Sequence, residues 1–377
     1  MDAQRSKPRL RDLGITIGML PTGPWNAITD VPGVRVGQTT VLHGDGPLQV
    51  GSGPARTGVT AIHPHEGSAW EWQVPAAIDI LNGAGEITGR SLVDEFGVLG
   101  SPILITNTLS VGGVHRATVD WMVREHPEIG PGGWVAPVIA ETYDGHLNDI
   151  AGQHVTSEQV FAALDSASSG SVAEGNVGGG TGMMLFGFKG GNGTASRVVE
   201  IGDERYTVGV FVQGNCGRLD DLLVAGVPVG QELGPMLRER RAQHEAERDH
   251  DGSIIIIIAT DAPLSDRQLA RLCRRGMLGL SRVGSIAHHG SGDLLLAFSN
   301  AEGNRVNVHA PAPILTTTRL SDEYINPLFQ ATVAATEEAI LNAIIAAETM
   351  IGRDGNTVFA LPHDDMLDVM RRYGRLA

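Results

Sequence analysis

Short apolar runs separated by glycine and proline dominate the chain, and this pattern predicts more strands than helices. Residues 26–41 alternate in the manner of a strand, a turn and a second strand. Further strands are predicted where apolar and β-branched residues cluster, at residues 101–108, 134–140, 206–213 and 293–298. Helices are predicted where apolar residues follow helical spacing or a glycine turn, at residues 84–96, 261–276 and 324–351.

The most apolar strand candidate directly follows the most polar segment. Nine of the 16 residues in segment 237–252 are charged, with mixed signs and no apolar face, which predicts an exposed helix end or a flexible connector. Ser253 and five consecutive isoleucines come next, and such a β-branched run is typical of a strand buried on both faces. The chain is therefore expected to pass from solvent into the core at Gly252 and Ser253.

Strands fill the predicted interior, and helices are available to cover them on both sides. This combination favours a layered α/β sandwich. No repeat of fixed period is present, and 377 residues suffice for a large core. We expect one integrated domain over residues 1–377, interrupted by the exposed connector 237–252.

Composition and charge restrict the partners of the protein. Its 50 glycines show no collagen-like period, so they indicate many tight turns and sites built from loops. Hydrophobic residues at 42% and charged residues at 19% are ordinary for a soluble globular protein. The net charge of −15 would repel phosphate backbones and anionic lipid surfaces, so neither nucleic acid nor membrane is an expected partner.

Cysteine spacing, the N-terminal residues and the length of apolar stretches bear on the cellular compartment. Cys216 and Cys273 lie in no CxxC or zinc-like spacing, which fits a reducing environment. The start carries no secretion signal, and no apolar stretch was seen to approach the roughly 18 residues of a membrane span. These features favour a cytoplasmic location.

Motifs for several other chemistries are missing. The glycine-dense segment 175–193 satisfies neither the phosphate-loop nor the dinucleotide pattern, so close packing near a site is the better interpretation. His63, His65 and Glu66 have no HExxH motif or further clustered ligand and are interpreted as loop residues. A GxSxG elbow is also missing. We therefore expect no metal and no cofactor.

The Gly252–Ser253 junction places a hydroxyl at the start of a rigid strand. Glycine tolerates strained backbone angles, so a twisted peptide bond here would be open to attack by the Ser253 hydroxyl. An N-to-O acyl shift and ester hydrolysis would release chains 1–252 and 253–377. The new α-amino group, with a pKa of about 7.7–8.0, could then serve as general base for the hydroxyl. By itself, however, Gly-Ser is also an ordinary strand start.

Several long blocks, in order along nearly the whole chain, resemble one family. The matching blocks are residues 26–37, 136–149, 175–197, 208–217, 251–264 and 288–299. In these blocks the chain is similar to the L-aminopeptidase/D-amidase-esterase family, which includes the β-peptidyl aminopeptidases. The resemblance implies a self-processing hydrolase with a four-layer α-β-β-α sandwich, like N-terminal-nucleophile hydrolases in layering but different in connectivity. It also implies homotetramers without metal that release N-terminal L-, D- or β-residues from small peptides, amides and esters with a free amine.

Position by position, the resemblance assigns roles to four residues. Ser253 matches the nucleophile, and Asn215 matches a side-chain amide of the oxyanion hole, where a fixed dipole suits charge that develops in the transition state. Glu141 matches the carboxylate that receives the ammonium group of the substrate. Tyr143, two residues on and expected on the same strand face, matches a tyrosine near the oxyanion. The structural alternatives are a turn asparagine, a surface carboxylate and a core tyrosine.

Three further residues are assigned with structural alternatives beside them. Ser291 and Asp293 match a serine–acid pair beside the nucleophile, although some relatives have glutamate at the second position. Such a pair could orient the α-amine or relay a proton, or it could cap a turn before the next strand. Trp134 is a candidate for the wall of the substrate pocket, and a core tryptophan is the alternative.

Two other function classes stay open. One is a self-processing acyltransferase of similar layering, but that class uses a threonine nucleophile where this chain has Ser253. The other is an unprocessed, inactive homologue that acts as a binding protein. Intact mass distinguishes the latter from an active enzyme, which gives two fragments.

Overall fold

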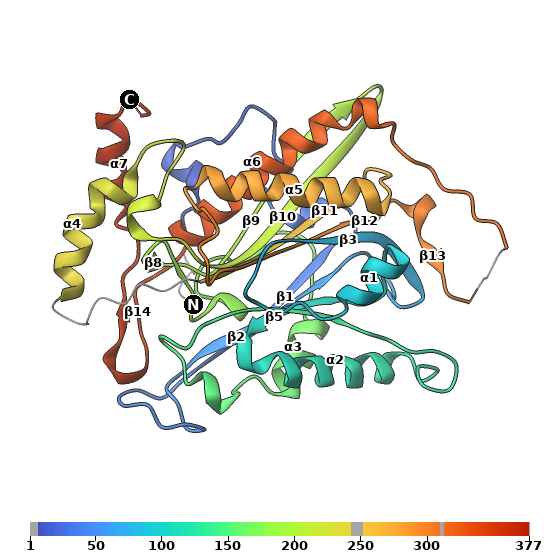
Figure 1. Cartoon of the computed structure of the whole chain (residues 1–377), viewed down its shortest axis with the longest axis horizontal. Coiled ribbons are helices and arrows are strands. Elements are labelled where there is room, and N and C mark those ends of the chain that lie inside the picture. Colours follow the sequence, from blue (N-terminus) through green and yellow to red (C-terminus); the bar gives the residue numbers. More distant parts are fainter. Residues whose placement is uncertain (1–6, 243–251, 310–312, 377) are drawn as a thin grey trace, which may run out of the picture.

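The computed structural model describes residues 7–242, 252–309 and 313–376, and its largest element is a seven-stranded sheet (Figure 1). The strand order is β13-β3-β12-β11-β10-β9, with β4 added beside β3. All neighbours are antiparallel except β11 and β12, which run parallel. The strands are β3 (Trp72–Gly83), β4 (Val98–Leu99), β9 (Asn192–Ile201), β10 (Glu204–Asn215), β11 (Ser253–Thr260), β12 (Gly292–Ser299) and β13 (Val306–Asn307).

A second, four-stranded sheet has the order β1-β2-β5-β6. Only β5 and β6 run parallel in it. Two short two-stranded ribbons complete the strands, β7 with β8 and β14 with β15. The bounds are β1 (Arg35–His43), β2 (Ala55–His63), β5 (Ile103–Asn107), β6 (Val138–Thr142), β7 (Met184–Leu185), β8 (Phe188–Lys189), β14 (Met350–Ile351) and β15 (Thr357–Val358).

Helices cover the outer face of each sheet, which gives four layers (Figure 1). α5 and α6 pack on the larger sheet, and α2 and α3 pack on the smaller one. The expected α-β-β-α sandwich is therefore confirmed. The helices are α1 (Arg90–Phe96), α2 (Val111–Glu125), α3 (Ser157–Asp165), α4 (Val229–Ala242), α5 (Asp266–Arg282), α6 (Asn326–Ile345) and α7 (His363–Arg372).

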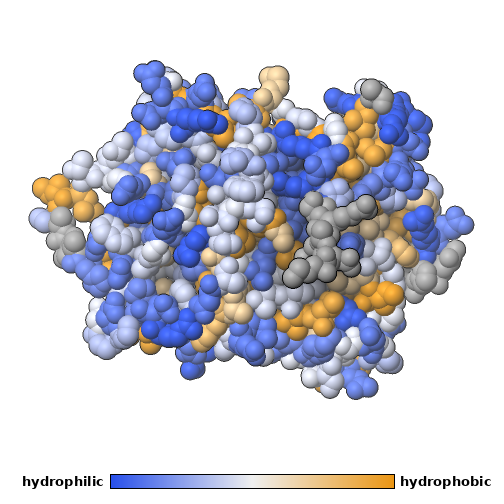
Figure 2. Space-filling view, turned by 180° about the vertical axis from the view of Figure 1, so that it is seen from behind, coloured by the Kyte–Doolittle hydropathy of each residue, from blue (hydrophilic) through white to orange (hydrophobic). Residues whose placement is uncertain are grey.

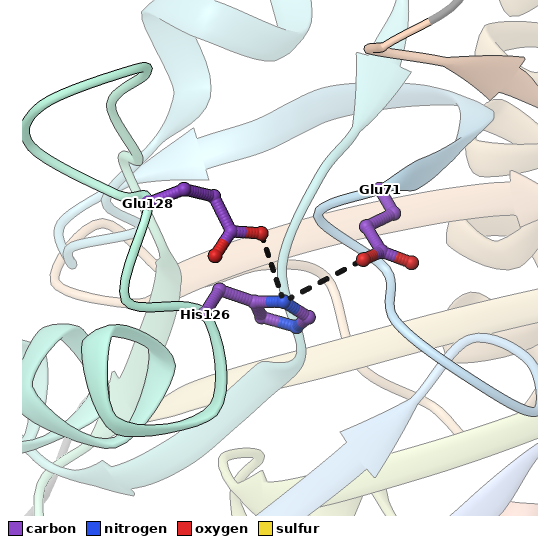
Figure 3. Close-up of side chains that lie close together, drawn as sticks. All are labelled: Glu71, His126 and Glu128. Carbon is purple, nitrogen blue, oxygen red and sulfur yellow. Dashed lines mark ion pairs between the residues drawn. The ribbon is translucent and has the colours of Figure 1, made fainter.

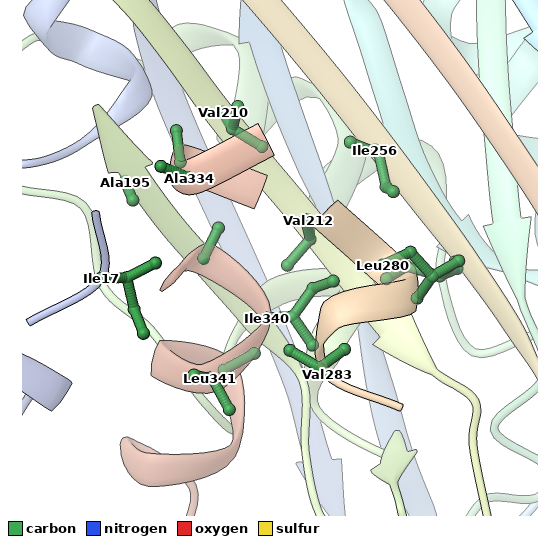
Figure 4. Packing of buried hydrophobic residues seen from close by; sticks show 14 of the residues in the cluster. Ile17, Ala195, Val210, Val212, Ile256, Leu280, Val283, Ala334, Ile340 and Leu341 are labelled. Carbon is green, nitrogen blue, oxygen red and sulfur yellow. The ribbon is translucent and has the colours of Figure 1, made fainter. Parts of the chain in front are cut away.

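The isoleucine strand β11 contributes side chains to apolar clusters on both faces of the larger sheet. Ile254, Ile256 and Ile258 face the apolar cluster under α5 and α6, part of which Figure 4 shows. Ile255 and Ile257 point the other way, into the cluster between the two sheets. Because successive side chains of a strand alternate between faces, a strand that is apolar throughout belongs in the centre of such a sandwich. The prediction of a strand buried on both faces is confirmed.

α6 is long and apolar enough to cross a membrane by length and composition, contrary to the expectation that no stretch approaches this limit. However, 89% of its apolar window is buried inside the protein, which is typical of a core helix. The buried Glu338 of α6 accepts hydrogen bonds from Arg197 at 2.5 Å and from Arg11 at 2.7 Å. Buried charges are tolerated in such paired arrangements. The surface in Figure 2 is mostly hydrophilic, with apolar residues in small separate groups.

Several predicted elements differ from the observed ones. The helix expected at 84–96 begins only at Arg90, because Ile87 still pairs with Ala140 as an extended residue. β6 begins at Val138 instead of residue 134. In the segment 237–252, residues 237–242 end helix α4, with Leu237 buried, and residues 243–251 lie outside the described residues.

Candidate active site

Four strand ends meet where the isoleucine strand begins. In the register of the larger sheet, Ser253 at the start of β11 pairs with Asn215 at the end of β10. On the other side, Ile254 pairs with Asp293 of β12. Asp293 in turn pairs with Asn82 near the end of β3. Residues far apart in the sequence are thus brought to one edge of the sheet, around the Ser253 hydroxyl.

The Ser253 side chain is held in place but not completely enclosed. It is 6% exposed, and its Oγ accepts a hydrogen bond of 3.1 Å from the backbone N–H of Gly292. Gly252 is pressed against the opposite strand. A Cβ at Gly252 would lie 1.6 Å from the carbonyl oxygen of Asn215, closer than any real contact allows. Only glycine therefore fits before Ser253 without displacing the backbone.

Asn215 is oriented by the glycine-dense segment. Its Oδ1 accepts a hydrogen bond of 2.8 Å from the N–H of Met184, so its Nδ2 faces the other way. A Cβ at Gly252 would lie 3.1 Å from this Nδ2, so the amide donors reach the Gly252–Ser253 junction. The buried Lys189 fixes the same segment by donating to the carbonyl oxygens of Met183 at 2.6 Å and Gly190 at 2.8 Å. The Asn215 amide is therefore held in a fixed orientation beside Gly252, as an oxyanion donor would have to be.

Ser291 and Asp293 form a buried, hydrogen-bonded pair at the start of β12. Ser291 Oγ donates a hydrogen bond of 2.8 Å to Asp293 Oδ1. Asp293 Oδ2 is buried and has no hydrogen-bond partner within the described part of the chain. Burial raises the pKa of Asp293 to about 6, although the Ser291 hydrogen bond opposes the rise. The carboxyl group can therefore hold or release a proton close to neutral pH.

Glu141 reaches the site from the smaller sheet. It lies on β6 and is 3% exposed. A Cβ at Gly85 would lie 3.2 Å from Glu141 Oε1 and 3.4 Å from Gly292 Cα, so the carboxylate and the residue that binds Ser253 Oγ flank the same glycine. Its Oε1 accepts from the N–H of Glu86 at 3.0 Å, and its Oε2 accepts from Thr108 Oγ1.

Glu141 has no Lys or Arg partner for its charge among the described residues. Burial raises its pKa, the two hydrogen bonds lower it, and the nearby charge of Glu86 raises it further. Within the described ranges no lysine or arginine forms an ion pair with it. A buried carboxylate of this kind gains most from a ligand that brings a positive charge.

Two predicted residues lie differently from expectation. β6 ends at Thr142, so Tyr143 lies in the following turn and not on the strand face of Glu141, and it is 48% exposed. Trp134 is 63% exposed and lines a separate depression of about 260 Å³ together with Gln73 near the start of β3. The site lies at the other end of this strand, roughly 30 Å away at about 3.3 Å per residue. The structure does not bring Trp134 to the other site residues.

Some contributors were missed by the sequence analysis. Asn82 Nδ2 donates to the carbonyl oxygens of His288 at 2.8 Å, His289 at 3.1 Å and Ser291 at 2.7 Å, and so holds the loop before Asp293. Thr108 was missed as well, because nothing in its local sequence indicates a contact with Glu141. For Asn82, its place in the NGAG turn at residues 82–85 was the one feature of the sequence that could have indicated a structural role.

Metal ligands are not part of this site. His63 is the last residue of strand β2 and not a loop residue, whereas His65 lies in the loop after β2, as expected, and is buried. Burial lowers the pKa of both, that of His63 to about 4. Across residues 7–242, 252–309 and 313–376, one group of side chains could hold a metal ion, and it lies near the start of β3, away from Ser253. The groups found around Ser253 in the described residues are a hydroxyl, an amide and carboxyl groups.

A four-layer sandwich with a serine hydroxyl at the first residue of a central strand is the arrangement of N-terminal-nucleophile-type hydrolases. Proteins of known structure share this fold. The computed structure superposes on the L-aminopeptidase D-Ala-esterase/amidase of Ochrobactrum anthropi with a TM-score of 0.90 and 45% identity, covering 98% of this chain and 100% of the other. The PH0078 protein of Pyrococcus horikoshii gives 0.91 and 45% over 98% and 100%.

Sequence relatives agree. The chain is 46% identical to the β-peptidyl aminopeptidase BapA of Sphingosinicella microcystinivorans, covering 100% of this chain and 95% of the relative. It is 47% identical to the BapA of Sphingosinicella xenopeptidilytica, covering 98% and 92%. The profile of peptidase family S58 matches residues 26–358. The protein belongs to peptidase family S58 and is a hydrolase of the serine aminopeptidase type.

Proposed function

We propose that this protein cuts its own chain between Gly252 and Ser253 and then works as an aminopeptidase with an N-terminal serine nucleophile. The single observation that carries this proposal is the junction itself. The Ser253 hydroxyl, the Asn215 amide and a glycine that cannot be replaced meet at one peptide bond. Self-cleavage would give chains of residues 1–252 and 253–377.

The cleavage step follows from this geometry. Ser253 Oγ attacks the carbonyl carbon of Gly252, its proton passes to the departing nitrogen of Ser253, and an ester replaces the amide. Water then hydrolyses the ester, which leaves a carboxyl group on Gly252 and an α-amino group on Ser253. We assign the binding of the oxygen that becomes negative during the attack to the donors of Asn215 Nδ2. The position of this amide beside Gly252 supports the assignment.

In turnover the new α-amino group of Ser253 accepts the proton of its own hydroxyl, which then attacks the carbonyl carbon of the substrate. The free ammonium group of the substrate lies on Glu141, which restricts attack to the first amide or ester bond. The amine or alcohol leaves with a proton, and water releases the acyl group from Ser253. The Ser291–Asp293 pair orients the α-amino group or holds its proton, and Tyr143 is proposed to lie near the oxyanion.

The proposed substrates are small peptides, amides and esters with a free N-terminal amine. The two relatives that share 46% and 47% identity over nearly the full chain are β-peptidyl aminopeptidases, so we infer that β-residues are accepted at the N-terminus. The Ochrobactrum protein supports α-residue amides and esters as a second group. We further propose a cytoplasmic homotetramer, which sedimentation of the purified protein and cell fractionation would test.

The test combines intact mass with kinetics. The purified wild-type protein should show fragments of residues 1–252 and 253–377, whereas Ser253→Ala should remain one inactive chain. Glu141→Gln should raise KM for amides with a free amine at least tenfold, because the ammonium group loses its charged partner. A wild-type chain that stays uncut and inactive, or equal turnover of N-acetylated amides, would refute the proposal.

A further inference from the structure

Three side chains of types that can bind metal lie together near the start of β3, at the other end of this strand from Ser253. Glu71 directly precedes β3, His126 is the C-cap of α2, and Glu128 follows two residues later (Figure 3). His126 Nδ1 lies 3.8 Å from Glu71 Oε1 and 3.6 Å from Glu128 Oε1. All three atoms lie within 4.8 Å of one another. We call these residues the His126 cluster.

The distances in the His126 cluster are too long for hydrogen bonds. An N–H···O bond is about 2.7–3.2 Å long, so neither carboxylate is bonded to the ring. Zinc binds nitrogen and oxygen ligands at about 2.0–2.1 Å with tetrahedral angles, which separates neighbouring ligand atoms by about 3.3 Å. Movements of a few tenths of an ångström would bring the two carboxylate oxygens to this spacing from His126 Nδ1.

Within the described residues, His126 is the only ion-pair partner of the two carboxylates. No lysine or arginine of the described residues forms an ion pair with Glu71 or Glu128, whose side chains are 39% and 42% exposed. α2 ends at Glu125, so its partial negative charge also faces this place. Two carboxylates and a helix C-terminus therefore surround one imidazole nitrogen, and a cation would relieve their repulsion.

The imidazole ring is held for ligation from its far side. His126 Nε2 lies 2.8 Å from Ser68 Oγ, which also accepts a hydrogen bond of 3.1 Å from the N–H of Glu71. Metal-bound histidines almost always use their second nitrogen in this way, which fixes the ring and its tautomer. The His126 side chain is only 16% exposed, so its free nitrogen is directed to the two carboxylates.

We propose that Glu71, His126 and Glu128 bind one divalent transition-metal ion, with zinc as the best match and water completing its coordination. An imidazole nitrogen with two carboxylates suits first-row transition metals, whereas magnesium and calcium prefer oxygen ligands alone. The ion joins the end of α2, in one outer layer, to the start of β3, in the central sheet. Its role is to stabilise this junction, since the cluster lies roughly 30 Å from Ser253 along β3.

The experiment uses the full-length protein without an affinity tag. After EDTA treatment and gel filtration, zinc is titrated by calorimetry, and the metal content is measured by elemental analysis after dialysis. We expect one zinc ion per chain and a rise in Tm with zinc. Glu128→Gln and His126→Ala should each weaken binding at least tenfold, whereas His115→Ala, a histidine on the same helix, should bind as the wild type does. Glu128→Gln also serves if His126→Ala fails to fold.

Three results would overturn the proposal: no zinc binding by the wild type, equal binding by Glu128→Gln, or equal affinity for magnesium. Amidase activity is measured on the same samples. It should be the same with and without EDTA at the assay temperature, because the cluster is remote from the site. A wild-type protein that binds zinc but has no amidase activity would count against the proposed function alone. A wild-type protein that is active but binds no zinc would count against the metal site alone.

Discussion

Asp293→Asn should stabilise the uncut chain at neutral pH, although it removes a residue of the proposed site. Asp293 is fully buried, and only one of its two carboxyl oxygens has a partner, the Ser291 hydroxyl. Asparagine has the same shape, and its Oδ1 can accept the same hydrogen bond. The substitution thus removes a buried negative charge and leaves the packing unchanged. Measurements belong in a Ser253→Ala background, in which the 252–253 bond stays intact.

The size of the effect follows from the pKa of Asp293, which burial raises from 3.8 to about 6. Because the folded state holds its proton more tightly than the unfolded state, stability falls as the pH rises from 3.8 to about 6 and is lowest above that range. At 1.36 kcal/mol per pKa unit, the charged form costs at most about 3 kcal/mol at pH 7.5. At pH 4.5 the same relation gives about 1 kcal/mol.

Calorimetry of both chains at the two pH values tests this reasoning. With an unfolding entropy of about 2.1 cal/mol/K per residue, a gain of about 3 kcal/mol in a chain of 377 residues raises Tm by about 4 °C at pH 7.5. The gain should shrink to about a third at pH 4.5. A variant less stable than its parent at pH 7.5, or an equal gain at both pH values, would show that the carboxyl group is not destabilised by burial.

The other predictions concern groups around the same bond. Gly252→Ala should slow self-cleavage strongly, because its Cβ would overlap the carbonyl oxygen of Asn215. The fraction of intact chain over time on denaturing gels measures this, and cleavage at the wild-type rate would contradict it. Asn215→Ala should lower kcat of any processed enzyme by about 10²–10³, the usual effect of one oxyanion donor, and a change confined to KM would argue against that role. Asn82→Ala should lower kcat by about tenfold to a hundredfold with little change in KM, because a displaced 288–291 loop misaligns Ser291. An unchanged kcat would show that the loop keeps its conformation without the Asn82 hydrogen bonds.

Local sequence was sufficient wherever one segment carried its own signal. The five isoleucines of β11 required burial on both faces, and the spacing of Leu269, Leu272 and Cys273 marked the buried side of α5. β3 has no such signal. Its twelve residues contain Pro75 and end in Gly83, which interrupt the pattern, and its place beside β12 depends on long-range pairing.

Resemblance indicated most of the candidate site residues, but it did not give their arrangement. Glu141 and Gly85 are separated by 55 residues and by a change of sheet, so no periodicity connects them. Trp134 shows the converse. It precedes β6, the strand of Glu141, yet it lies at the far end of β3 from Ser253 because the loop before β6 folds back against Trp70. Proximity in sequence did not imply proximity in the fold.

The two buried carboxylates of the site acquire cations at different stages of the proposed reaction. In the uncut chain Asp293 and Glu141 both have pKa values raised by burial, and neither has a basic side chain paired with it in the described residues. Cleavage creates an ammonium group at Ser253, the neighbour of the residue that pairs with Asp293. Substrate binding brings a second ammonium group to Glu141. Each carboxylate is therefore costly before its own step, and each step of the proposed reaction gains from relieving that cost.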